Sequence, residues 1–181
     1  SSWGEIRINA TIASYMKGYS DPRSAVYFTT SKLGGDSPYM GMRSGLEGVK
    51  PATYSGYSMP NYEQKDDMLM FCAAETAFLR AEGALRGWDM GGSARDFYEQ
   101  GVKLSFDQRK VSGADEYLAN AVAVPEPFVD PVNPAKCNYT PKTKITIAWN
   151  EGASTEEKLE RIITQKWIAN FPLGFEGWAD Y

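Results

Sequence analysis

An alanine-rich segment in the middle of the chain constrains the fold most. Residues 66–86 place small and apolar side chains three and four positions apart: Met70, Ala73, Ala74, Ala77, Phe78, Ala81 and Ala84. This spacing predicts a helix with one continuous apolar face. Asp66 and Asp67 stand where acidic side chains favour a helix N-terminus, and Gly87 is expected to end the helix. Because alanine is short, a second helix can approach this face closely.

A partner for that helix follows directly along the chain. After the turn at Gly91 and Gly92, helical spacing returns at Ala94, Tyr98, Gly101 and Val102. A small residue, a tyrosine four positions later and a small residue three positions after that are similar to the second helix of a tetratricopeptide repeat. We see no second copy at a period of about 34 residues. The sequence therefore predicts one antiparallel helix pair, with any further pairs degenerate or outside the chain.

A third long helix is predicted over residues 155–171. Its apolar stripe consists of Leu159, Ile162, Ile163, Trp167 and Phe171. Ser154 and Glu157 have the spacing of a capping box at its start, and Pro172 is expected to end it. Residues 175–181 again show helical spacing and stop before a stable helix is complete. We therefore expect the chain to be a fragment of a longer protein.

The remaining segments are predicted to be mostly loops. We expect a helix over residues 5–17, a short helix over 114–121, and brief strands at 25–29 and 144–149. Residues 24–60 are rich in Gly, Ser, Tyr and Pro, and loops of this length are usually functional or disordered. Their aromatic content argues against disorder. The predicted fold class is mainly all-α, a tetratricopeptide-like helix pair with long aromatic-rich loops and at most short strands.

Composition excludes several classes of function. The 181 residues include no histidine, so a Ser-His-Asp or Cys-His site is excluded within the chain. The net charge is −4 and no basic run could follow a phosphate backbone, so no nucleic-acid partner is expected. Cys72 and Cys137 have no metal-ligand spacing, and the sequence contains no D-x-D-x-D-G calcium loop. We predict no metal, no cofactor and no enzymatic activity.

Glu75 and Glu82 of the alanine-rich segment are a candidate acidic pair for acid–base chemistry. They lie two helical turns apart, beyond the range of paired glycosidase carboxylates. Arg80 and Arg86 are close enough in sequence to pair with them, so structural ion pairs are the favoured interpretation. No segment reaches the roughly 20 apolar residues that span a bilayer.

Three segments carry motifs that occur together in one protein family. Residues 17–23 read KGYSDPR and precede a loop punctuated by glycine; residues 74–102 contain AETAFLRAEGALRGW and ARDFYEQGV; residues 158–181 contain QKWIA and E-x-WADY. In this order they resemble the C-terminal region of the SusD/RagB family, nutrient-capturing outer-membrane lipoproteins of Bacteroidetes. The resemblance covers most of the chain.

The resemblance implies a non-catalytic protein at the surface of the bacterial outer membrane. Such a protein captures an oligosaccharide and delivers it to a SusC-like, TonB-dependent transporter, and a lipid anchor absent from this chain would attach it to the membrane. Two alternatives stay open: capture of oligopeptides by the same type of uptake system, and a helical-repeat scaffold that binds only proteins.

The resemblance also implies that the chain is part of a single SusD-like domain. Within it, residues 1–65 would form a helix and a long Tyr/Gly/Pro-rich loop, and residues 66–122 the helix pair and a short helix. Residues 123–181 would form a loop, a short strand and the C-terminal helices.

The predicted ligand-binding residues are three tyrosines of the long loop, Tyr39, Tyr54 and Tyr57. Sugar rings stack on flat aromatic side chains, in the way that aromatic faces contact one another. By resemblance, binding residues of the family lie on loops between the DPR segment and the alanine-rich helix, here residues 24–65. For any one tyrosine, the competing interpretation is that its ring packs on the scaffold and fixes the loop.

Overall fold

The chain divides into two compact units. The computed structural model describes residues 6–47, 50–63, 65–67 and 69–174. We call the first unit, Ser1–Asp66 with Val124–Lys144, the loop unit, and the second, Asp67–Ala123 with Ile145–Tyr181, the helical unit. The described residues contain seven helices and three isolated bridges but no strand, so the predicted mainly all-α fold class is confirmed.

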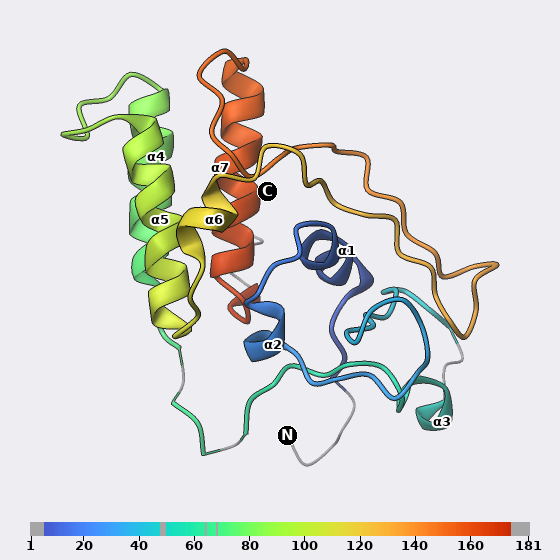
Figure 1. Ribbon diagram of the computed structural model, residues 1–181. Helices are drawn as coiled ribbons and strands as arrows, with labels where there is room; N and C mark the ends of the chain where they lie inside the picture. The colour runs from blue at the N-terminus through green and yellow to red at the C-terminus, as the bar shows by residue number, and fades with distance from the viewer. Residues whose placement is uncertain (1–5, 48–49, 64, 68, 175–181) are drawn as a thin grey trace. The chain divides into compact units, whose positions relative to one another are not determined.

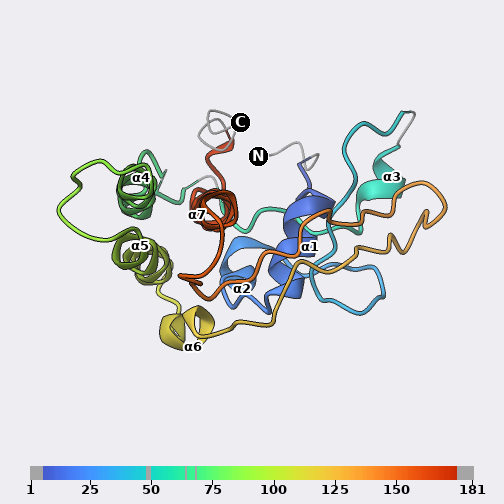
Figure 2. The ribbon, with the colours of Figure 1, turned by 90° about the horizontal axis from the view of Figure 1, so that it is seen from above.

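The helical unit is built on three long helices and one short one. They are α4 (Ala73–Leu85), α5 (Ala94–Gln108), α6 (Ala114–Leu118) and α7 (Thr155–Ala169). Helices α4, α5 and α7 lie side by side in Figure 1 and are seen nearly end-on in Figure 2. The predicted helix pair is therefore confirmed, and α7 packs against it.

Small residues set the separation between α4 and α5. Ala74, Ala77 and Ala81 of α4 are buried, as the alanine-rich face predicts. A Cβ atom added to Gly101 of α5 would stand 2.7 Å from the Phe78 ring, so no side chain other than hydrogen fits there. The hydroxyl of Tyr98 donates to the Ile147 carbonyl at 2.6 Å and fixes the loop before α7 against α5.

Capping boxes begin two of these helices. In α7 the Ser154 side chain accepts from the Glu157 backbone N–H, while Glu157 accepts from the Ser154 backbone, as predicted. Helix α5 begins with the same arrangement of Ser93 and Asp96, which was not predicted.

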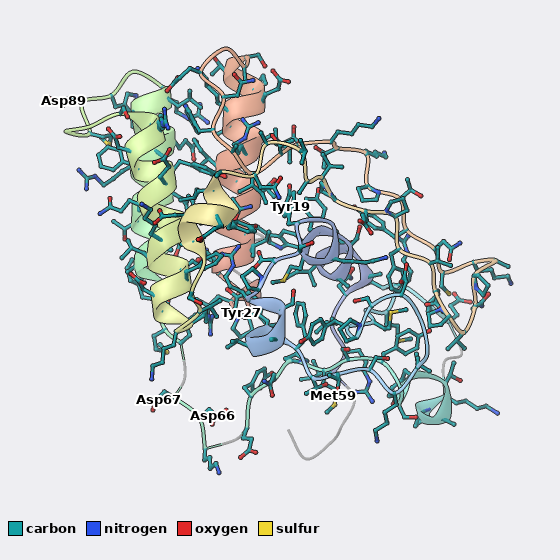
Figure 3. The ribbon with its side chains drawn as sticks, viewed as in Figure 1. Tyr19, Tyr27, Met59, Asp66, Asp67 and Asp89 are labelled. Atoms are coloured by element: carbon teal, nitrogen blue, oxygen red, sulfur yellow. The ribbon has the colours of Figure 1, made fainter. Side chains whose placement is uncertain are left out.

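The loop unit has three short helices joined by long connections. They are α1 (Ala10–Gly18), α2 (Ser24–Tyr27) and α3 (Pro51–Tyr54). Backbone hydrogen bonds order the loop between α2 and α4: Ile8 pairs with Ser58 and Met42, and Thr29 donates to Met59. Figure 3 labels Tyr27 and Met59 on two segments of this network. The predicted loop is thus held by main-chain pairing instead of a sheet.

The DPR motif folds into a buried turn after α1. The side chains of Asp21 and Arg23 are both 0% exposed, and the Arg23 guanidinium contacts the Asp21 carboxylate at 2.6 Å. The same carboxylate accepts from the Arg23 backbone N–H at 2.9 Å. Because a charge is buried only when it is paired, the motif has a structural role in this chain.

Two predicted strands and the predicted starts of two helices are wrong. Residues 25–29 were expected to form a strand, but they fall in α2 and an isolated bridge at Phe28. Residues 144–149 form no strand, because their polar groups bond to helices. The first helix begins at Ala10, not at residue 5. The predicted segment at 175–181 lies outside the described residues.

The fourth error concerns the start of α4. It begins at Ala73, so Asp66 and Asp67 lie in the segment before the helix and do not flank its first turn (Figure 3). Glu75 is the acidic residue of the first turn, and Met70, expected on the apolar face, is 76% exposed. Figure 3 also labels Asp89, on the connection between α4 and α5.

Candidate ligand-binding face

A small hydrophobic core holds the loops of the loop unit together. Its buried members are Ala10, Met40, Tyr57 and Phe128. Four partly buried side chains pack around them: Leu33, Met42, Tyr54 and Tyr139. We call this set the loop core. It joins residues that are up to 129 positions apart in sequence, and two of the three predicted site tyrosines belong to it.

Tyr57 lies inside the loop core. It is 5% exposed, and its hydroxyl donates to the Asp130 carboxylate at 2.8 and 2.9 Å. Burial and this hydrogen bond raise the pKa of Tyr57, because both disfavour the phenolate. The ring offers little surface to a ligand here, so its direct contact with a ligand stays a prediction.

Tyr54 lies at the end of α3 and is only partly buried. The guanidinium of Arg7 stands over its ring, 5.1 Å from the centroid, which is within cation–π range. The Arg7 Nε also donates to the Tyr54 carbonyl at 2.7 Å. The arginine thus fixes both the ring and the backbone of Tyr54.

Tyr139, in the C-terminal segment of the loop unit, also has an arginine over its ring. Arg43 stands over its ring at 5.4 Å, and the backbone of Tyr139 exchanges hydrogen bonds of 2.8 and 3.0 Å with Phe128. Tyr139 is not among the predicted binding residues, because the family resemblance points only to the loop at residues 24–65. The basic residues around it, Lys136 and Lys142, were a signal that could have directed attention there.

Tyr39 is partly buried but packs differently. Its ring lies 6.0 Å from that of Phe28, in an edge-to-face arrangement, and its backbone N–H donates to the Ser37 hydroxyl. The next residue, Met40, is a buried member of the loop core. The structure therefore places Tyr54 and Tyr57 on one core and Tyr39 beside it.

The acidic residues of α4 have structural partners. Glu82 pairs with Arg86 at 2.7 Å, as predicted. Glu75 instead accepts from the Asn170 amide at 3.0 Å and lies 3.9 Å from the Lys166 ammonium. The predicted pairing of glutamates with nearby cations is confirmed for Glu82, while Glu75 joins α4 to α7.

Metal and thiol chemistry have little support in the described part of the chain. No three or more His, Cys, Asp and Glu residues among those described are placed to hold a metal ion. Cys72 and Cys137 are free and buried, and burial together with the Asp130 charge raises the pKa of the Cys137 thiol. Within the described ranges, no helix has the length and apolar character needed to cross a membrane.

Comparison with known proteins identifies the family. The family model of SusD-like proteins, described as SusD and RagB outer membrane lipoproteins, matches residues 1–181. The chain belongs to the SusD-like family. The predicted resemblance is confirmed over the whole sequence, and with it the assignment to a family of outer-membrane lipoproteins.

Solved structures of SusD-like proteins resemble the chain closely. A chitin-binding SusD homologue from Flavobacterium johnsoniae has 49% identity and a TM-score of 0.92, and the match covers 100% of this chain and 37% of that one. A SusD homologue from Bacteroides uniformis has 50% identity and a TM-score of 0.89, over 96% of this chain and 36% of that one.

A SusD-like protein from Bacteroides thetaiotaomicron has 48% identity and a TM-score of 0.89, over 96% of this chain and 37% of that one. The chain therefore spans little more than a third of the length of these relatives. A search of curated proteins found no significant match.

Proposed function

We propose that this chain contributes to non-catalytic capture of glycans by a SusD-like lipoprotein at the outer-membrane surface. The observation that carries the proposal is the similarity to a chitin-binding SusD homologue over 100% of the chain at 49% identity. In this proposal the chain is part of one SusD-like domain, and the bound glycan passes to a SusC-like, TonB-dependent transporter.

The binding face would be the part of the loop core that carries Tyr54 and Tyr139. Both tyrosines are partly buried, so packing holds them in place while neither residue is fully enclosed. Flat aromatic surface suits the apolar face of a sugar ring, and the adjacent guanidinium groups can donate hydrogen bonds to hydroxyl groups. Tyr39 would extend the face, and Tyr57 would support it from within the core.

The order of the surrounding loops favours binding. Backbone pairs join residues 8, 42 and 58, and a further pair joins Phe128 to Tyr139. Loops that are already ordered lose less conformational entropy when a ligand binds, so more of the interaction energy contributes to affinity. No covalent step is needed for this function.

Calorimetric titration of the chain with chito-oligosaccharides tests the proposal. We expect saturable binding that Tyr54→Ala weakens by about fivefold, since loss of one stacking ring is worth about 1 kcal/mol. Tyr62→Ala is the matched control, because Tyr62 is a 46% exposed tyrosine of the same long loop outside the loop core. Binding of peptides but of no member of a broad glycan panel would overturn the proposal.

A further inference from the structure

The loop unit has a net positive charge, although the net charge of the whole chain is negative. The loop unit contains ten Lys and Arg against eight Asp and Glu, whereas the helical unit contains nine against fifteen. The buried charges of Asp21 and Arg23 cancel each other, and a further acid of the loop unit, Asp130, is buried and already hydrogen-bonded. The charge that the loop unit presents to a ligand is therefore more positive than the count suggests.

Two of its cations stand at the proposed binding rings. Arg7 lies over Tyr54 and Arg43 over Tyr139, and both tyrosines pack on the same loop core. The planar fork of a guanidinium matches a carboxylate or sulfate. Arg7 already donates from Nε to the Tyr54 carbonyl and from Nη1 to the Ile6 carbonyl, so Arg43 is the main candidate for binding an anion and Arg7 adds positive charge. An aromatic surface and a cation are thus combined twice on one small scaffold.

The surroundings of Arg43 strengthen this reading. Arg43 stands over the Tyr139 ring, and Lys136 lies three residues before Tyr139 in sequence; both cations counteract the raised pKa of the Cys137 thiol. Asp130 is the acidic group that acts there, but it is buried and accepts hydrogen bonds from the Tyr57 hydroxyl and the Val132 and Asn133 backbone. Its acceptor capacity is largely used, so the carboxylate leaves Arg43 available to an external anion.

We propose that the glycan bound by the loop unit is acidic, carrying carboxylate or sulfate groups. A sugar ring stacks at Tyr139 while its anionic group is bound by Arg43 with the help of Lys136, and Arg7 provides a second cation beside Tyr54. This inference rests on the proposed glycan-binding function and adds the charge class of the ligand.

The test compares an acidic with a neutral probe of similar length: sulfated chondroitin oligosaccharides and chito-oligosaccharides, titrated calorimetrically into the 181-residue chain. We expect the acidic probe to bind at least about tenfold more tightly, as one or two charge-assisted hydrogen bonds would give. The advantage should shrink between about 50 and 300 mM salt, because salt screens partly exposed charges.

Substitutions then assign the effect to the site. Arg43→Gln should lower the affinity for the acidic probe by about tenfold and the affinity for the neutral probe by a smaller factor, because a guanidinium binds an anionic group more strongly than a hydroxyl group. Arg43→Lys keeps the charge without the planar fork, so its affinity for the acidic probe should lie between those of the parent and of Arg43→Gln. Lys32→Gln is the control, because Lys32 is an exposed cation of the same unit outside the loop core. Thermal melting confirms that each variant is folded.

Three results would overturn the inference. The first is neutral binding that depends on Tyr54 with no preference for the acidic probe, and in that case the proposed glycan-binding function stands. The second is a preference for the acidic probe that Arg43→Gln and Lys32→Gln reduce equally, because this would show that the positive charge of the loop unit attracts the probe without a specific site. The third is no binding of either probe, which counts against the proposed function as well.

Discussion

The hydroxyl of Tyr57 donates to both carboxylate oxygens of Asp130, 73 residues further along the chain. Asp130 is 0% exposed and also accepts from the backbone N–H groups of Val132 and Asn133. One carboxylate therefore connects the tyrosine-rich loop to the turn that leads to Tyr139. This bond holds the two sides of the proposed binding face in register.

Replacing Tyr57 by phenylalanine should destabilise the protein without weakening ligand binding directly. The change keeps the ring but removes a donor from a buried carboxylate, for which we expect a loss of about 1.5–3 kcal/mol of unfolding free energy. Urea denaturation measures the loss. If the variant were as stable as the parent, the Tyr57–Asp130 bond would have no structural importance.

The same variant isolates a pH effect. Burial, and then the bond to Asp130, raise the pKa of Tyr57 in the folded protein above its ordinary value of 10.0. The folded state thus holds the proton more tightly, so its stabilisation is complete below pH 10 and declines as the pH rises further. Between pH 9 and 11 (about one unit on each side of that value), the parent should lose more stability than Tyr57→Phe does. Equal losses would contradict this assignment.

Asp21→Asn should be far more damaging than Asp36→Asn. Asp21 pairs with Arg23 where both side chains are 0% exposed, and removing one partner of a buried pair is expected to cost about 3–5 kcal/mol. Asp36 pairs with Lys17 at 2.5 Å, but its side chain is 73% exposed, so its replacement should cost at most about 1 kcal/mol. Chemical denaturation of both variants gives the comparison; similar losses would refute the structural role of the DPR turn.

The long helices could be predicted from sequence because their signals are local. Ala77 and Ala81 on α4, and Ser154 with Glu157 at the start of α7, act within a few residues of one another. The start of α4 could not be predicted well, because the acidic pair at residues 66 and 67 imitates a helix N-terminus. Residues 144–149 alternate like a strand, but the tertiary bonds from Tyr98 and Arg161 determine their conformation.

The residues of the proposed binding face could be selected from sequence only in part, because its contacts join residues that are far apart along the chain. Tyr54 could be selected because it lies on the tyrosine-rich loop to which the family resemblance points, but its partner Arg7 is 47 residues away. Tyr139 and Arg43 are separated by an even longer stretch of chain, and no spacing rule connects them. Composition indicates that the long loop is unusually rich in tyrosine. Only the fold shows that Tyr57 is buried in the loop core while Tyr139 is partly buried beside it.

Gly101→Ala should destabilise the protein even though alanine favours helices. In an open helix position the change is worth roughly 0.5–1 kcal/mol in favour of alanine. Here the added Cβ would meet the Phe78 ring at 2.7 Å, and overpacking of this kind typically costs about 1–3 kcal/mol. Gly34→Ala is the control, because nothing lies within 4 Å of its Cβ position. A stabilised Gly101→Ala variant would show that α4 and α5 can separate freely.

Ser154→Ala should lower the unfolding free energy by about 1 kcal/mol, because the N-cap hydroxyl of α7 is lost. Hydrogen bonds from the Ser154 backbone and then its hydroxyl lower the pKa of Glu157 below 4.5. The folded state therefore holds the Glu157 proton less tightly, so this stabilisation is present above pH 4.5 and is lost as the pH falls through the lowered pKa. The difference between parent and variant should accordingly narrow in acid. Thr155→Ala is the control, because Thr155 is next to the N-cap but outside the capping box. Thermal melts from pH 7 to 3 (a range of about four units) should show no such pH dependence for this variant. If the stability difference between the parent and Ser154→Ala stayed constant over this range, the coupling to Glu157 would be contradicted.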